Sequence, residues 1–140
     1  ICEKGYQLDH SVWTNSNSRY KKYENLNFFK ESRGWSSGPT ALLKASQDKH
    51  KEVFVLGFDY YGLGDNFNNV YADTPNYKRS TDTATYHGNW MRQTEMVMRE
   101  FPHIYYYRII DSSTKIIADW NRVNNFKHIN YDEFKEKLGI

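Results

Sequence analysis

The chain has 140 residues, a formal net charge of +2 and a hydrophobic content of 39%. This length suits about one domain with its own core, which needs no disulfide or metal to stabilise it. Because lysine and arginine together exceed aspartate and glutamate by only two, the charge balance favours neither nucleic acid nor a membrane surface as a partner.

The single cysteine, Cys2, excludes an internal disulfide and suits a reducing compartment. No run approaches the roughly 18 apolar residues of a membrane-spanning helix, and no signal-peptide pattern is present. We therefore expect a soluble, cytoplasmic protein without a transmembrane segment. The first residue is Ile1, which leaves open that part of a longer polypeptide is absent.

The first half of the chain changes character at about residue 36. Residues 1–35 are polar and aromatic without a sustained period, so they predict irregular structure with at most one short strand. A helix is expected near 38–48, because serines precede it, Pro39 is tolerated in the first turn, and leucine and alanine supply an apolar face. The apolar run that follows predicts a buried strand over 53–58.

Residues 62–84 are rich in Gly, Asn, Asp, Thr and Pro, the residues that form turns. A stretch of this length without regular structure is uncommon inside a compact domain unless it is a functional lid or disordered. Val70 and several aromatic side chains argue against simple disorder. We therefore predict a lid-like insertion over 62–87.

The second half of the chain alternates helical and extended patterns. Apolar residues recur on one helical face over 90–101, and a proline then ends the helix. β-Branched and aromatic residues predict a strand over 104–110. A short edge strand over 126–129 and a closing helix over 131–138 follow.

This order of elements predicts an α/β fold, a Rossmann-like sheet with flanking helices and the inserted lid segment. We expect one α/β domain over residues 1–140. That the chain is the C-terminal part of a larger domain stays open as an alternative.

Several short motifs between residues 36 and 88 occur in a characteristic order. They are Ser36-Ser37-Gly38 at a helix start, Gly57-Phe58-Asp59-Tyr60-Tyr61 after a strand, Tyr71 in the predicted lid, Pro75-Asn76-Tyr77-Lys78, and His87. In that order the segment resembles the bacterial lipooligosaccharide sialyltransferases. The resemblance implies a metal-independent, inverting glycosyltransferase without a cofactor, which moves a sugar from a cytidine-monophosphate (CMP) donor to the hydroxyl of a glycan acceptor.

The resemblance also implies roles for individual residues. His87 matches the histidine that is the general base of the family. This role agrees with its chemistry, since imidazole with a pKa of about 6.5 accepts a hydroxyl proton near neutral pH. Tyr61 and Tyr71 match tyrosines that donate hydrogen bonds to the leaving phosphate, which explains how the reaction dispenses with a cation. The substrate-binding positions that the resemblance implies are Ser37, Gly38, Asp59, Asn76 and, displaced by one position, Arg33.

Each candidate residue also has a plain structural alternative. His87 can belong to the start of the following helix, Asp59 can cap a turn, and Tyr71 can hold the predicted lid down. Because neighbouring side chains of an extended strand point to opposite faces, one of Tyr60 and Tyr61 belongs in the core, and we expect Tyr60 there. The scattered histidines and one cysteine lack the spacing of metal ligands, so no metal site is expected.

The chain departs from the family pattern in its first part, where the nucleotide-binding strand and its Asn-Gly-Pro-Ser type loop have no counterpart. Either an N-terminal half is absent or the chain is a reduced relative with another ligand. The alternative function is a non-catalytic Rossmann-like interaction or structural module of a larger, for example viral, assembly, with the aromatics of 1–35 at an interface. For both functions we expect a homo-oligomer or a subunit of an assembly. We expect the protein in the cytoplasm of a bacterium or of a virus-infected cell, and the alternative location is the surface of a membrane.

Overall fold

The computed structural model describes residues 2–29, 33–62, 64–75, 77–84 and 86–140. The chain divides into two compact units, residues 1–35 and residues 36–140. Both contain helices and a parallel sheet, so the protein is mixed α/β. This architecture is compatible with the Rossmann-like class that the order of elements predicts.

The N-terminal unit contains more regular structure than its sequence predicts. Two short helices, η1 (Cys2–Lys4) and α1 (Tyr6–Asp9), precede two strands, β1 (Val12–Thr14) and β2 (Leu26–Phe28). The strands pair in parallel, with Val12 opposite Leu26. Each strand has only three residues, which is too short to display the alternation by which a strand is recognised in a sequence.

The C-terminal unit is built on a three-stranded parallel sheet in the order β3-β4-β5. Its helices and strands agree closely with the predicted ones, apart from β3, which ends three residues early, and the unpredicted helix η2. In chain order they are α2 (Ser37–Gln47), β3 (Glu52–Val55), α3 (Gly88–Glu100), β4 (Tyr105–Ile109), η2 (Ala118–Arg122), β5 (Phe126–Ile129) and α4 (Tyr131–Leu138).

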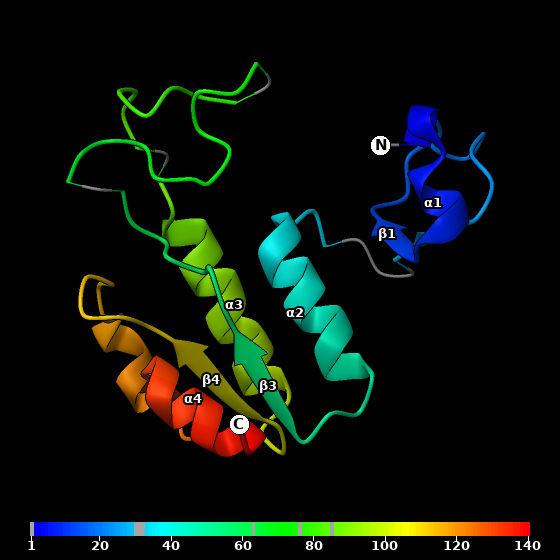
Figure 1. Ribbon diagram of the computed structural model, residues 1–140. Coiled ribbons are helices and arrows are strands. Elements are labelled where there is room, and N and C mark those ends of the chain that lie inside the picture. Colours follow the sequence, from blue (N-terminus) through cyan, green and yellow to red (C-terminus); the bar gives the residue numbers. More distant parts are fainter. Residues whose placement is uncertain (1, 30–32, 63, 76, 85) are drawn as a thin grey trace. The chain divides into compact units, whose positions relative to one another are not determined.

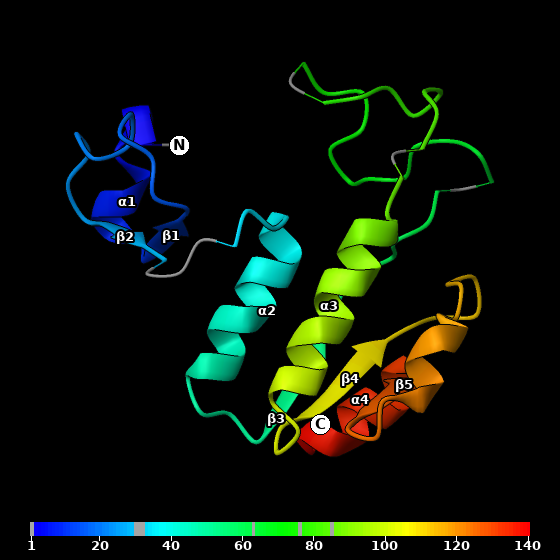
Figure 2. The same ribbon diagram turned by 180° about the vertical axis from the view of Figure 1, so that it is seen from behind.

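Helices cover both faces of this sheet, with α2 and α3 side by side on one face and α4 on the other (Figures 1 and 2). On the α2 and α3 face, the hydroxyl groups of Tyr106 and Ser46 are hydrogen-bonded at 2.8 Å. On the α4 face, Phe54 packs between Tyr107 and Phe134, with ring centroids 5.2 and 5.1 Å away. The central strand β4 therefore contributes apolar surface to both layers, as strands of parallel sheets do.

The closing helix shows why local sequence predicts these elements well. The side chain of Asn130 accepts a hydrogen bond from the main-chain N–H of Glu133 at 2.8 Å, and Glu133 accepts one from the N–H of Asn130 at 3.0 Å. This reciprocal capping box satisfies donors that the first turn cannot satisfy by itself. Gly139, in the left-handed conformation with φ of 71°, ends the helix.

Candidate functional site

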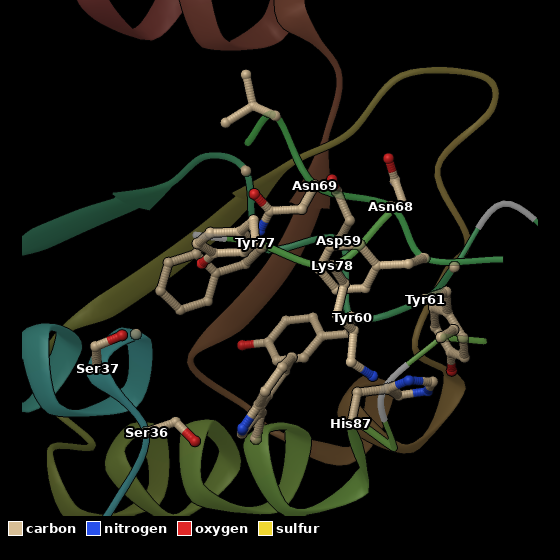
Figure 3. Close-up of a pocket in the computed structure, with 18 of the residues that line it drawn as sticks. Ser36, Ser37, Asp59, Tyr60, Tyr61, Asn68, Asn69, Tyr77, Lys78 and His87 are labelled. Atoms are coloured by element: carbon tan, nitrogen blue, oxygen red, sulfur yellow. The ribbon is translucent and has the colours of Figure 1, made fainter. Parts of the chain in front are cut away.

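A cavity of about 670 Å³ opens in the C-terminal unit at the carboxyl end of β3. The start of α2, the loop after β3, parts of the segment 64–84 and the start of α3 form its wall. This volume suits a small-molecule ligand, and open α/β folds bind ligands at the carboxyl edge of their parallel strands. Figure 3 shows side chains from these segments converging on the cavity.

The loop after β3 turns sharply at Tyr60, whose φ of 65° is uncommon for a residue other than glycine. The Tyr60 side chain is buried, with its hydroxyl 2.6 Å from the Thr94 hydroxyl on α3 and its ring edge-on to Trp120 at 5.3 Å. Burial raises the pKa of Tyr60 above its ordinary value, so the hydroxyl stays protonated. Its predicted place in the core is confirmed, although the chain there is turned rather than extended.

Tyr61 and His87 come together at one end of the cavity. Their ring centroids are 4.6 Å apart in an edge-on arrangement, and both residues line the cavity (Figure 3). The ammonium group of Lys115 lies 4.6 Å from the centre of the Tyr61 ring. His87 occupies the N-cap position of α3, but its side chain makes no capping hydrogen bond. The imidazole is therefore not used to cap the helix at whose start it stands.

The start of α2 forms another part of the wall. Ser36, Ser37 and Gly38 line the cavity, with Ser36 at the N-cap position. A β-carbon on Gly38 would lie 3.0 Å from Cζ of Phe58, so glycine lets the Phe58 ring approach the helix closely. Pro39 has no N–H group and the N–H of Thr40 donates to the oxygen of Ser36, so the first-turn N–H groups without a partner in their own helix are those of Ser37 and Gly38. This end of the cavity therefore offers main-chain donors and the positive end of a helix dipole.

The segment 64–84 folds back on itself beside the cavity. Phe67 donates a main-chain hydrogen bond to Asp82 at 2.8 Å, and Ala84 donates one to Asp65 at 2.9 Å, on either side of an isolated bridge. Tyr77 and Lys78 from this segment line the cavity. Two arms of the segment are thus held together by hydrogen bonds, although its described residues form neither a helix nor a strand.

The other predicted site residues have different locations. Asp59 is exposed and lines the cavity. Tyr71 is 60% exposed and does not line it; its ring lies 5.7 Å from that of Tyr77. Arg33 belongs to the N-terminal unit, where its guanidinium lies 4.8 Å from the Trp35 ring. Asn76 lies outside the described residues.

Arg108, which lies behind the cavity wall, is not among the site residues predicted from the sequence. It is 1% exposed and donates hydrogen bonds to the main-chain oxygens of Phe58, Asp59 and Lys115. A charged residue inside the aromatic and aliphatic run of β4 is the signal that points to it. Lys115 gives no such signal, since it is one of 12 lysines in the chain and lies in a polar link.

Within the described parts of the chain, no three His, Cys, Asp or Glu side chains gather closely enough to hold a metal ion. None of the described helices has both the length and the apolar composition needed to cross a membrane. Comparison of the chain with protein-family models, curated proteins and solved structures found no match.

Proposed function

We propose that the chain is a glycosyltransferase of the sialyltransferase-like kind, which transfers a sugar from a CMP-activated donor to a hydroxyl of a glycan acceptor. The observation that carries the proposal is the pairing of Tyr61 with His87 at the wall of a ligand-sized cavity. These two residues are far apart in the sequence, and both belong to the motifs that resemble the family.

The proposed reaction uses His87 as the general base. The imidazole removes the proton from the acceptor hydroxyl while that oxygen forms a bond to the anomeric carbon of the donor. The bond from this carbon to the phosphate oxygen breaks, and its electron pair leaves with CMP. The Tyr61 hydroxyl donates a hydrogen bond to the phosphate, which stabilises the charge that develops there.

The helix starts support a phosphate-bearing ligand. Both α2, through Ser37 and Gly38, and α3, through His87, present their first turns to the cavity. Helix N-termini favour anions because their main-chain N–H groups and dipoles point to the ligand. Lys78, which also lines the cavity, adds a positive charge on the side of the segment 64–84.

The proposal includes a Rossmann-like sheet and a lid formed by residues 62–87. Tyr77 and Lys78 of this segment line the cavity, whereas Tyr71 does not. We therefore assign the leaving phosphate to Tyr61, and the role that the resemblance implies for Tyr71 stays a prediction. In this scheme the protein works in the cytoplasm as a homo-oligomer or as part of an assembly.

Release of CMP from CMP-sialic acid tests the proposal. The wild-type protein should release CMP in the presence of a glycan acceptor, and His87→Ala should slow this by about 100-fold or more, the usual contribution of a general base. His50→Ala is the matched control, since it removes an exposed histidine that does not line the cavity. Equal rates for wild type and His87→Ala would refute the catalytic role.

A non-catalytic interaction module is the second candidate. Aromatic side chains of the N-terminal unit favour it, because Tyr6, Trp13 and Tyr20 are 50%, 43% and 43% exposed. Aromatic residues are enriched at protein interfaces. Sedimentation of the purified protein tests this alternative: a monomer that releases CMP from the sugar nucleotide would exclude it, and an inactive oligomer would support it.

A further inference from the structure

The buried arginine Arg108 has an unusual set of partners. Its Nε donates to the oxygen of Phe58 at 2.8 Å, its Nη1 to that of Lys115 at 2.9 Å, and its Nη2 to that of Asp59 at 3.0 Å. All three acceptors are neutral main-chain carbonyl groups. None of the ion pairs found among the described residues includes Arg108.

A buried charge with only neutral acceptors is costly for stability. Removing a cation from water carries a desolvation penalty that carbonyl dipoles offset only in part, and apolar side chains of similar volume often serve stability as well or better. Burial lowers the pKa of Arg108, but a guanidinium keeps its proton in proteins. The positive charge therefore persists at this position.

This charge lies directly behind the wall of the cavity. Two of the residues whose carbonyl groups it holds, Phe58 and Asp59, line the cavity, and its Cζ is 5.7 Å from the centre of the Tyr60 ring. The third carbonyl belongs to Lys115, whose ammonium group lies over the Tyr61 ring. Arg108 thus joins the loop after β3 to the loop after β4. The joined loops carry Tyr61 and Lys115, whose ammonium group lies over the Tyr61 ring.

We propose that Arg108 is a positioning residue whose buried charge, acting through the wall that it holds in place, gives the cavity its preference for anionic, phosphate-bearing ligands. The inference rests on the proposed function for its ligand class. In this scheme the positive charges of Lys78 and Lys115 also favour an anionic ligand, and the negative charge of the Asp59 carboxylate disfavours it. Because low-dielectric surroundings screen a buried charge less than an exposed one, Arg108 retains its effect at physiological salt.

Calorimetric titration with CMP and with uncharged cytidine tests the inference. The wild-type protein should bind CMP more tightly than cytidine, and Arg108→Met should lower the ratio of the two affinities severalfold, because it removes a positive charge that attracts the phosphate of CMP and has no counterpart to attract in cytidine. Arg108→Lys is the matched control, since it keeps a positive charge and should keep most of the ratio. A purely structural role would instead weaken both ligands equally.

Equal affinity of the wild-type protein for CMP and cytidine, or no binding of CMP, would overturn the proposed role of Arg108 without any variant. If Arg108→Met does not fold, Arg108→Gln supplies the neutral side chain with donors for the carbonyl groups, and an unchanged ratio there would also overturn it. Binding of CMP that depends on Arg108, without release of CMP from the donor, would refute the transfer reaction and leave the inference standing.

Discussion

The hydrogen bond between Tyr60 and Thr94 ties the cavity wall to α3, and its removal is the most direct test of how the wall is built. Tyr60→Phe deletes one hydroxyl and leaves the ring in place. The two oxygen atoms are 2.6 Å apart, and the residues are 8% and 2% exposed. Water therefore has little access to replace the lost partner.

The expected loss of unfolding free energy is about 1–2 kcal/mol. A neutral hydrogen bond contributes about 1 kcal/mol net, and a buried group left without its partner costs about 1–3 kcal/mol. The expected cost lies in the lower half of the range of about 1–3 kcal/mol, because the Thr94 hydroxyl can turn and donate to a main-chain oxygen of the preceding helical turn. For a unit of this size the loss lowers the Tm by about 5–10 °C.

Urea unfolding followed by circular dichroism measures this loss as a lower midpoint at constant slope. Thr94→Val should cost a similar amount, and the double variant should cost less than the sum of the two, because both remove the same interaction. Tyr61→Phe is the matched control and should change the stability by no more than about 0.5 kcal/mol. An unchanged midpoint for Tyr60→Phe, or strictly additive losses in the double variant, would refute this account of the wall.

Three other predictions concern the same unit. Asn125→Ala should lower the unfolding free energy by about 2 kcal/mol, because the Asn125 amide donates to three main-chain oxygens at and beyond the end of α3. Urea unfolding measures this loss, with a substitution of the exposed neighbour, Asn124→Ala, as the control, and equal stabilities of the two variants would contradict the prediction. Gly38→Ala should weaken CMP binding about threefold or more and leave the urea midpoint nearly unchanged. The reason is that the new β-carbon would lie 3.0 Å from the Phe58 ring in the cavity wall. An unchanged CMP affinity in a titration would contradict this prediction. Burial and the nearby Arg108 charge lower the pKa of His128 in the folded protein. As the pH drops below about 6.5, the unfolded chain therefore binds a proton at this histidine before the folded protein does, and the unfolding free energy should fall. Urea midpoints measured over this pH range should change less for His128→Gln than for the wild type, and the same change in both would contradict the prediction.

Most elements of the C-terminal unit could be predicted from the sequence, because their signals are local. The helical period before Pro102, the β-branched and aromatic run of β4, and the capping pair of Asn130 and Glu133 each act within a few residues of chain. The short strands β1 and β2 could not be predicted, since strands of three residues exist only through their pairing with each other. The predicted end of β3 at residue 58 is three residues too late, because the chain leaves the extended conformation at Gly57, where φ is positive.

The candidate site divides in the same way. The family resemblance implied roles for Tyr61, Tyr71, His87 and the start of α2, and all of these except Tyr71 line the cavity. Three-dimensional packing settled the rest: Tyr71 lies outside the cavity, and Arg108 stands behind the wall. Local sequence records which residues favour a helix, a strand or a turn. Which side chains meet depends on the path of loops between distant segments, and that path follows from the balance of burial, hydrogen bonding and charge over the whole unit.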